Sequence, residues 1–397
     1  GRLTVVGKKS IDGEVPHKVL KPLVLATLRE IISERCNIYE PQTKSHGHQG
    51  GKGQRIPRWC SEAILARGHW EGIQPIRGIV RCPVLREDGT VVQTEGYDKV
   101  SGLYLDIDDG FPEVPENPSP ELIAQAVASL LDIVADFPFA NEESRSAWLA
   151  SLLTPFAREA YRGCTGPIFL FNGNVPGTGK GLLVDINWRI VTGSSAVLNS
   201  IPSNNDDVRK LITSFVVEAS QLVLLDEIAD SLGCEALNAA LTGTTWKDRK
   251  LGHNEVIEGP LRFTMYGTGN NVNLSGDTPR RVCQIRLESA EEHPEDRSGF
   301  KYPNVVEHVR LHRPQLLIAA LTILRGFIVA GRPNQGIENW GSFQGWSDLV
   351  RGAIVWCGLA DPGLTRADVR DSADSDSESL LNFMRALKDV DPNGQGL

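Results

Sequence analysis

The 397-residue sequence contains no long hydrophobic run and no secretion signal. None of its apolar stretches approaches the roughly 18 residues that a membrane-spanning helix requires. Nor does a positively charged segment followed by an apolar one open the chain. With 41% hydrophobic and 23% charged residues, the composition is that of a globular chain long enough for two or three hydrophobic cores. We therefore expect no membrane association.

Cysteines at metal-binding or redox spacing are also missing. The seven cysteines include no Cys-x-x-Cys pair, and an odd, scattered set is typical of a reduced, cytoplasmic protein. The residues of zinc-ligand type near the N-terminus match no standard zinc spacing, so we expect no zinc site. They are Cys36, His46, His48, Cys60, His69 and Cys82. The formal net charge of −9 does not indicate a nucleic-acid binder, although a local basic groove is compatible with it.

Composition and periodicity divide the chain into four regions. We expect residues 1–115 to form a mixed α+β region that ends in a proline-rich linker, and residues 116–163 to form a helical segment. An α/β core is expected at 164–292 and a helical region at 293–397. Asp88–Gly89, between two short β-like runs, predicts a hairpin turn. We expect the whole chain to be a piece of a longer polypeptide.

The most informative segment lies at residues 172–184, where a glycine-rich stretch follows the continuous apolar run 166–171. This pattern predicts a strand buried on both faces, a tight turn, and a helix that opens at Lys180. Such a turn directs backbone N–H groups and a lysine ammonium toward phosphate oxygens. The candidate ATP-phosphate ligands are Asn174, Val175, Pro176, Gly177, Thr178, Gly179, Lys180 and Gly181.

This segment departs from the usual phosphate-binding pattern at two positions. Asn174 stands where glycine is usual, and Gly181 stands where a serine or threonine normally binds Mg²⁺. Water or Thr178 would have to replace that missing hydroxyl. The alternative interpretation is a glycine-rich turn that binds nothing, and the strand-turn-helix context favours the phosphate site.

A second buried strand is predicted at Leu222–Leu225, and two acids follow it. Ligands of parallel sheets bind beyond the carboxyl ends of the strands, which is where these acids would lie. We expect Asp226 to hold Mg²⁺ through water and Glu227 to orient and deprotonate the attacking water. The alternative is a strand that ends in two solvated acids.

A third strand, from residue 261 onward, ends in two amides. Asn270 is our first choice for positioning the attacking water beside the γ-phosphate, and Asn271 is the alternate. Arg280 and Arg281 then precede a strand at Val282–Leu287. They are either surface charge or the guanidinium that neutralises the charge developing in phosphoryl transfer. Since a neighbouring subunit often supplies that group, this second role requires an oligomer.

Residues 245–256 predict a charged hairpin between the second and third strands. Its basic residues are Lys247, Arg249, Lys250 and His253. Lysine and arginine that follow a phosphate backbone bind nucleic acid without sequence preference. The alternative is an ordinary charged surface hairpin, because Asp248 and Glu255 dilute its basic character.

In these motifs the chain resembles the superfamily 3 helicases of the AAA+ class, above all the primase-helicase proteins of phages, plasmids and other bacterial mobile elements. The resembling motifs are Pro-Gly-Thr-Gly-Lys-Gly at 176–181, Leu-Leu-Asp-Glu at 224–227, Asp-Arg at 248–249, Gly-Thr-Gly-Asn-Asn at 267–271 and Ser-Gly-Asp-Thr-Pro-Arg-Arg at 275–281. Phosphate-binding loops of this group often carry glycine at the position of Gly181.

The resemblance implies a P-loop NTPase (AAA+-like) three-layer α/β core with a mainly parallel sheet. It further implies a hexameric ring that requires ATP and Mg²⁺ and translocates on single-stranded or fork DNA in a bacterial cell or phage-infected host. Any primase activity is expected upstream of this chain. Two other functions stay open: an AAA+ ATPase that remodels a protein partner, and a monomeric P-loop kinase. The Lys-Leu-Gly-His hairpin tip favours nucleic acid over polypeptide.

Overall fold

The computed structural model describes residues 3–9, 17–38, 55–107, 111–161, 163, 165–229, 231–249, 256–291 and 293–367. The chain divides into two compact units, Gly1–Ile79 and Val80–Leu397. Within the described residues, no helix is both long and apolar enough to cross a membrane.

The first unit is small and has little interior. It consists of an antiparallel hairpin, β1 (Thr4–Lys9) with β2 (His17–Pro22), and two helices, α1 (Leu25–Arg35) and α2 (Arg58–Ala66). Among its described residues, the buried large apolar side chains are those of Leu28 and Ile56. A core of this size contributes little hydrophobic stabilisation.

The second unit begins with short antiparallel strands after β3 (Gly78–Val80), which spans the boundary between the units. These strands are β4 (Val84–Leu85), β5 (Val91–Val92), β6 (Gly96–Tyr97) and β7 (Leu103–Leu105). The hairpin predicted at Asp88–Gly89 is confirmed, because β4 and β5 pair antiparallel across it. Gly89 takes a positive φ of 82° there, and the Asp88 carboxylate accepts a hydrogen bond of 2.9 Å from the Thr90 amide.

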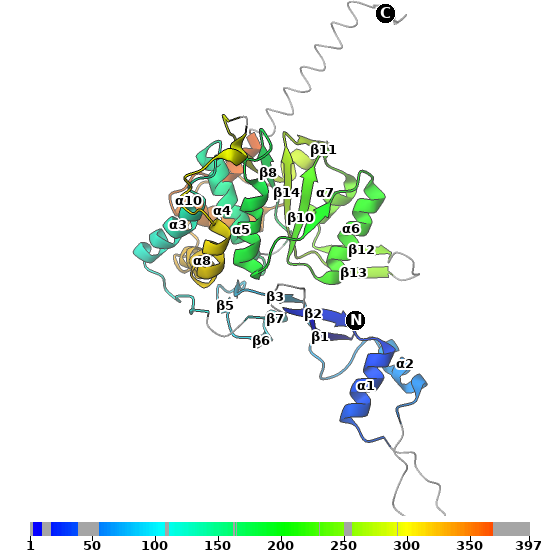
Figure 1. Ribbon diagram of the computed structural model, residues 1–397. Helices are drawn as coiled ribbons and strands as arrows, with labels where there is room; N and C mark the ends of the chain where they lie inside the picture. Colours follow the sequence, from blue (N-terminus) through cyan, green and yellow to red (C-terminus); the bar gives the residue numbers. More distant parts are fainter. Residues whose placement is uncertain are drawn as a thin grey trace, which may run out of the picture. The chain divides into compact units, whose positions relative to one another are not determined.

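A five-stranded parallel sheet forms the centre of the second unit (Figure 1). Its strands are β8 (Ile168–Gly173), β9 (Leu198–Ser200), β10 (Leu222–Ile228), β14 (Thr264–Asn270) and β16 (Val282–Leu287), and their spatial order is β16-β8-β14-β10-β9. The predicted α/β class is therefore confirmed. Strand β14 follows both β8 and β10 in the sequence but lies between them in the sheet. Strands that are far apart in the sequence thereby become neighbours.

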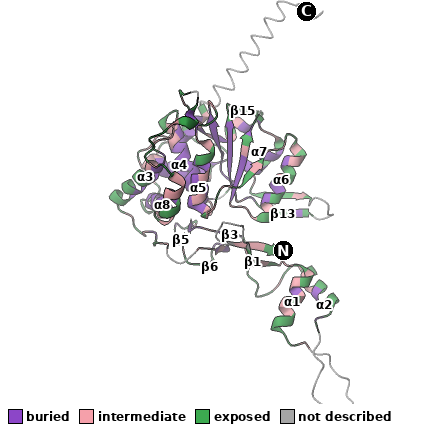
Figure 2. Cartoon of the chain, in the orientation of Figure 1, coloured by how far each residue is buried: buried purple, intermediate pink, exposed green. Residues whose placement is uncertain are grey.

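Alternate side chains of β8 enter two separate hydrophobic cores, which shows that helices cover both faces of the sheet. Phe169 and Phe171 belong to one core, whereas Ile168 and Leu170 belong to the other. Every residue of β8 is buried, as a strand covered on both faces requires (Figure 2). The sheet is thus the middle of three layers.

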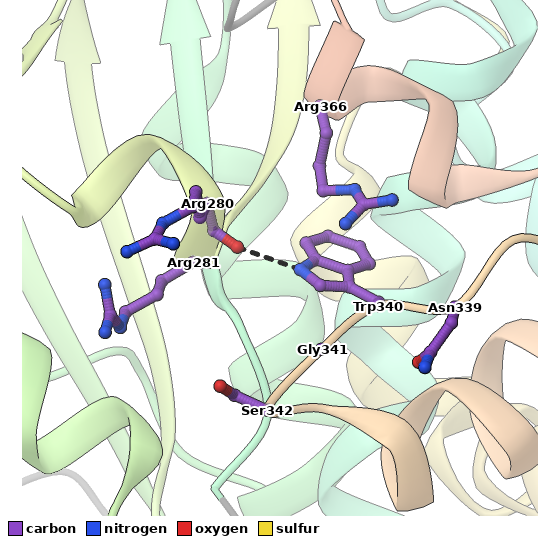
Figure 3. Close-up of a pocket in the computed structure, with 7 residues that line it drawn as sticks. All are labelled: Arg280, Arg281, Asn339, Trp340, Gly341, Ser342 and Arg366. Carbon is purple, nitrogen blue, oxygen red and sulfur yellow. Dashed lines mark hydrogen bonds between the residues drawn. The ribbon is translucent and has the colours of Figure 1, made fainter.

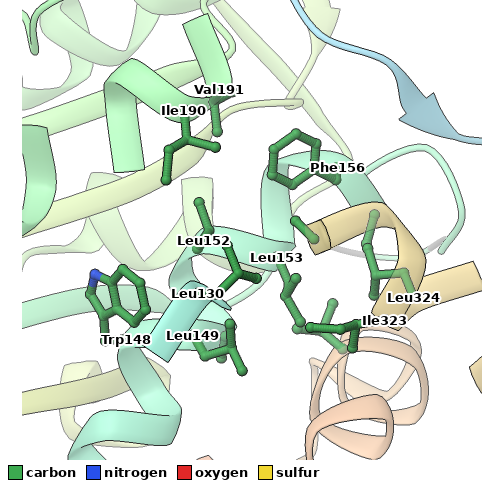
Figure 4. Close-up of a cluster of buried hydrophobic side chains, with 14 of the residues drawn as sticks. Leu130, Trp148, Leu149, Leu152, Leu153, Phe156, Ile190, Val191, Ile323 and Leu324 are labelled. Atoms are coloured by element: carbon green, nitrogen blue, oxygen red, sulfur yellow. The ribbon is translucent and has the colours of Figure 1, made fainter. Parts of the chain in front are cut away.

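The larger core joins helices that lie far apart in the sequence (Figure 4). Its helices are α3 (Pro120–Ile133), α4 (Glu142–Ala157), α5 (Lys180–Thr192), α8 (Val305–Val329), α9 (Gln344–Trp346) and α10 (Gly352–Trp356), the last two linked by a π-turn at Ser347–Arg351. The other core contains α6 (Asn205–Glu218) and α7 (Glu235–Thr242). The remaining elements are the strands β11 (Ser231–Leu232), β12 (Thr245–Arg249), β13 (Val256–Pro260) and β15 (Asn273–Leu274), and the short helices Thr278–Arg281, Pro294–Asp296 and Pro362–Leu364.

Candidate functional site

The carboxyl ends of β8, β10 and β14 meet at one edge of the sheet, and several predicted site residues lie there. Asn270, at the end of β14, pairs in register with Gly173, at the end of β8. Asp226 and Glu227 lie near the end of β10, on the other side of β14. The parallel pairing therefore gathers groups that are almost 100 positions apart in the chain.

The 174–179 loop connects β8 to α5 and depends on glycines. Gly177 and Gly179 have positive φ angles of 78° and 90°, a region that side chains disfavour. Space is also short, because a Cβ on Gly177 would lie 2.2 Å from Oε2 of Glu295, and one on Gly179 would lie 2.8 Å from the Phe137 ring. The path of the loop backbone therefore favours glycine at both positions.

The Lys180 ammonium lies inside this loop, at the first residue of α5. Its Nζ donates a 2.6 Å hydrogen bond to Oδ1 of Asn270 and longer ones to Oγ1 of Thr178 (3.3 Å) and the carbonyl of Val175 (3.4 Å). All three acceptors are neutral, and no described carboxylate forms an ion pair with Lys180. Desolvation by burial lowers the pKa of Lys180. A half-buried cation at a helix N-terminus with only neutral neighbours is a site for an anion.

Thr268, whose role the sequence did not reveal, ties the acids of β10 to β14. Its hydroxyl donates a 2.6 Å hydrogen bond to Oδ1 of Asp226 and accepts one of 3.0 Å from the Glu227 amide. The pairing register of β10 and β14 shifts between Leu225 and Ile228, and Glu227 takes a left-handed φ of 52°. Strain of this kind is characteristic of functional sites. The sequence feature that could have identified Thr268 is its position in the polar end of the third predicted strand.

The two asparagines of the third strand have different partners. Asn270 contacts Lys180, whereas Asn271 holds the loop: its Nδ2 donates to the carbonyl of Asn174 at 3.1 Å, and its Oδ1 accepts from Arg286 at 3.0 Å. Asn271 has a positive φ of 44°, which turns it away from the line of the strand. Only Asn270 therefore meets the cation of the loop.

One of the two departures from the usual phosphate-loop pattern, Asn174, has a structural explanation, and the other, Gly181, has none. Asn174 replaces glycine because its amide makes a pair of hydrogen bonds with the backbone of Ser289, at 2.8 and 3.1 Å. Gly181 is exposed, and nothing lies within 4 Å of where its Cβ would be. The Thr178 side chain is buried beside Lys180, and Pro176 is exposed. An extra hydroxyl at position 181 would thus fit sterically.

Arg280 and Arg281 lie at the opposite end of the sheet from Lys180. They end the short helix Thr278–Arg281, and the next residue, Val282, pairs with Ile168 at the start of β8. The six residues of β8 span roughly 16 Å at about 3.3 Å per residue. The structure therefore does not bring these arginines to the 174–179 loop of their own chain.

A cavity of about 280 Å³ opens beside these arginines (Figure 3). It is lined by Arg280, Arg281, Asn339, Trp340, Gly341, Ser342 and Arg366. The Trp340 indole donates a 2.9 Å hydrogen bond to the Arg280 carbonyl, and the Arg366 guanidinium lies 4.4 Å from the ring centroid of Trp340. Arg280 forms an ion pair with Asp277, which lowers the pKa of that carboxyl. Three guanidinium groups around one cavity make it positively charged.

The predicted charged hairpin is present as β12 and β13, which pair antiparallel with Arg249 opposite Val256. Lys247 and Arg249 are exposed, although Lys247 forms a 3.2 Å ion pair with Glu258. Lys250 and His253 lie outside the described residues. The hairpin ends at Pro260, before β14 begins, so that its base is at the amino edge of the sheet, away from Lys180 (Figure 1).

The hairpin rests on α6. The Trp246 indole donates a 2.9 Å hydrogen bond to the Thr213 hydroxyl, and Arg209 forms a 3.2 Å ion pair with Asp248 while lying 5.8 Å from the Trp246 ring centroid. These contacts fix the base of the hairpin to the helix that leads into β10. Arg249 extends beyond them.

Among the described residues, no group of three or more His, Cys, Asp or Glu side chains could hold a metal ion. A divalent ion at the carboxyl edge would therefore depend on Asp226, water and ligand oxygens, as Mg²⁺ usually does in phosphate sites.

No protein-family model matches the sequence, and no curated protein matches it. Two solved structures show a distant likeness, both described as A-form apo structures of the C-terminal region of NrS-1. The first has a TM-score of 0.35 and 15% identity, and covers 66% of this chain and 59% of that one. The second has a TM-score of 0.32 and 14% identity, and covers 57% and 52%. The chain thus spans between half and three fifths of those structures, and neither likeness assigns an activity.

The loop geometry predicts that alanine has opposite effects on stability at Gly179 and at Gly181, two positions further along the chain. Gly179→Ala should lower the free energy of unfolding by about 1–3 kcal/mol, because it forces a side chain into a left-handed conformation against Phe137. Gly181→Ala is the matched control and should raise it by about 0.5–1 kcal/mol, because the site is helical and open. Urea unfolding measures both, and equal effects of the two variants would contradict the loop geometry.

Proposed function

We propose that this chain is an ATP-hydrolysing motor that translocates on single-stranded or fork DNA as a hexameric ring. One observation carries the proposal: the Lys180 ammonium, inside a loop whose path favours glycine at two positions, reaches Asn270 on the neighbouring strand. A cation, a helix N-terminus and an amide thus converge where the γ-phosphate of a bound nucleotide would lie. The resemblance to superfamily 3 helicases noted from the sequence supports the same function.

The residues of the loop suit a triphosphate. A Cβ on Gly173 would lie 2.9 Å from Nζ of Lys180, so the ammonium fits only because no side chain occupies that position. Lys180 and the backbone N–H groups of residues 174–179 would bind the phosphate oxygens. Mg²⁺, held by Asp226 through water, would supply charge neutralisation at the β- and γ-phosphates.

Glu227 is the base in the proposed hydrolysis. It takes a proton from water as the water oxygen bonds to the γ-phosphorus and the bond from that phosphorus to the bridging oxygen of ADP breaks. Asn270 orients this water through its amide. Thr268 acts on neighbouring groups: its hydrogen bonds hold Asp226 and the Glu227 backbone in the strained arrangement seen in the structure.

The position of Arg280 and Arg281 supports a ring. Because they lie at the far end of their own sheet, they can neutralise phosphate charge only at the site of another subunit. Trp340 and Arg366 brace this region, and Asp277 restrains Arg280 until a stronger anion is present. The alternative function, remodelling of a protein partner, uses the same ring but requires an apolar grip. The exposed Arg249 and Lys247 on the hairpin favour a polyanion instead.

Two substitutions at the carboxyl edge test the motor. Lys180→Ala should lower ATP turnover by at least about 100-fold, because it removes the cation that stabilises the transferring phosphate. Glu227→Gln should retain nucleotide binding and lose turnover to a similar extent, because only the proton acceptor is gone. Turnover with and without single-stranded DNA, together with binding of a fluorescent nucleotide, measures these effects. Normal turnover in Lys180→Ala, or absence of any stimulation by DNA in the parent protein, would exclude the proposed function.

The hairpin is tested separately from hydrolysis. A Lys247→Ala/Arg249→Ala double variant should keep basal ATP turnover but lose most of its stimulation by single-stranded DNA, because the charges that follow the phosphates are missing. Lys210→Ala on α6 is the control, since Lys210 is an exposed lysine whose ion pair, with Asp207, lies within its own helix and not on the hairpin strands. Full stimulation in the double variant would remove the hairpin from the DNA path.

Subunit mixing tests the arginines. Arg281→Ala should lower turnover by about 1,000-fold or more without weakening nucleotide binding, because the group acts on transition-state charge. In mixtures with the parent protein, activity should fall faster than the fraction of parent subunits. A fall in simple proportion to that fraction would show that the arginine does not act across a subunit interface.

A further inference from the structure

The two units of the chain carry opposite charge. Residues 1–79 contain 13 Lys and Arg against 7 Asp and Glu, a formal charge of +6, whereas the whole chain carries −9 and the remainder therefore −15. The described residues of the first unit alone have the same excess, with 10 basic residues against 4 acidic ones. An excess confined to one unit of an acidic chain indicates a polyanionic partner for that unit.

The β1–β2 hairpin contributes part of this charge. Lys8 lies directly opposite Lys18 in the pairing register, so the hairpin places two cationic residues at one position of the ladder. Lys21, on the same hairpin, donates a hydrogen bond of 3.4 Å to the Lys8 carbonyl. Lys8 and Lys21 are both exposed.

Helix α2 adds an exposed aromatic ring that follows two exposed arginines in the sequence. The Trp59 side chain is 70% exposed, whereas Trp148, Trp340 and Trp346 in the second unit are at most 1% exposed. Its neighbour Arg58 is 74% exposed and forms a 2.8 Å ion pair with Glu62, and Arg55 is exposed just before the helix. Exposed aromatic rings on a basic surface are the groups on which unpaired bases stack.

The small interior of the unit gives a further reason for a partner. With only Leu28 and Ile56 buried among its described large apolar side chains, the unit has little hydrophobic stabilisation of its own. A ligand that binds only the folded unit stabilises it by mass action.

From these observations we propose that the first unit is a single-stranded nucleic-acid-binding module. Its lysines and arginines contact the phosphates, and Trp59 stacks on a base. The site is separate from the hairpin of the second unit and binds in the absence of nucleotide, so it does not depend on the proposed ATPase. The exposed tryptophan favours nucleic acid over an acidic protein, because the side-chain carboxylates of such a protein offer no base on which the ring could stack.

The test is binding of a fluorescein-labelled oligo(dT) strand to the full chain, followed by anisotropy without nucleotide over a series of salt concentrations. Trp59→Ala should weaken binding by about tenfold at every salt concentration, and Trp59→Phe should restore most of it. Arg55→Ala/Arg58→Ala should reduce the slope of log K against log salt by about 1.4, from about 0.7 for each lost phosphate contact.

Matched controls separate this site from general charge and from the motor. Arg310→Ala removes an exposed arginine that, like Arg58, pairs with a glutamate on its own helix, and Val100→Ala removes an exposed apolar side chain. Both should bind as the parent does, and thermal unfolding should show that all variants fold. Unchanged affinity and salt slope in the Trp59 and arginine variants would overturn the proposal and leave an acidic protein as the partner. Failure of DNA to stimulate ATP turnover would affect only the proposed motor.

Discussion

The insertion of β14 between β8 and β10 is the constraint on which the candidate site depends. Backbone groups of a strand buried on both faces must be paired, so the register of β14 is fixed on each side. On one side, that register sets Asn270 beside Gly173 and hence beside Lys180; on the other, Thr268 meets Asp226. A shift of one residue would move both contacts to the opposite face of the sheet. The chemistry at the edge is therefore a consequence of strand pairing in the core.

The sheet also separates two groups of charged residues, one at each end of its strands. The carboxyl edge holds Lys180 and the acids of β10, whereas the amino edge holds the arginine cavity and the base of the β12–β13 hairpin. Any coupling between these edges has to pass through packed strands and through α6, to which Trp246 fixes the hairpin. Such elements move as rigid bodies, because close-packed interiors transmit displacement and do not absorb it. The end of β10 is the strained part of this route, because Glu227 has a left-handed backbone conformation there.

The sequence was sufficient for features that depend on local composition. Continuous apolar runs predicted β8 and β10, the acids and amides that follow such runs marked the carboxyl edge, and Asp88–Gly89 marked a hairpin. It was insufficient where the determinant is a partner far along the chain. The role of Thr268 arises from register with β10, and Asn174 is explained only by the Ser289 backbone, 115 positions away. Strand β9 was missed because it is three residues long and Leu198 is 65% exposed, so no apolar run marks it.

The uneven charge of the chain would limit how DNA approaches the proposed motor. A unit with a formal charge of −15 repels a polyanion as a whole, but screening confines that repulsion to about 8 Å at physiological ionic strength. Groups that project from the surface, such as Arg249, can therefore contact phosphates, while the surrounding acids contribute no affinity. Of the two hairpin cations that the structure describes, Lys247 is already compensated, because it pairs with Glu258. Tight binding consequently needs cations elsewhere in the chain, and the +6 unit at residues 1–79 is where the sequence supplies them.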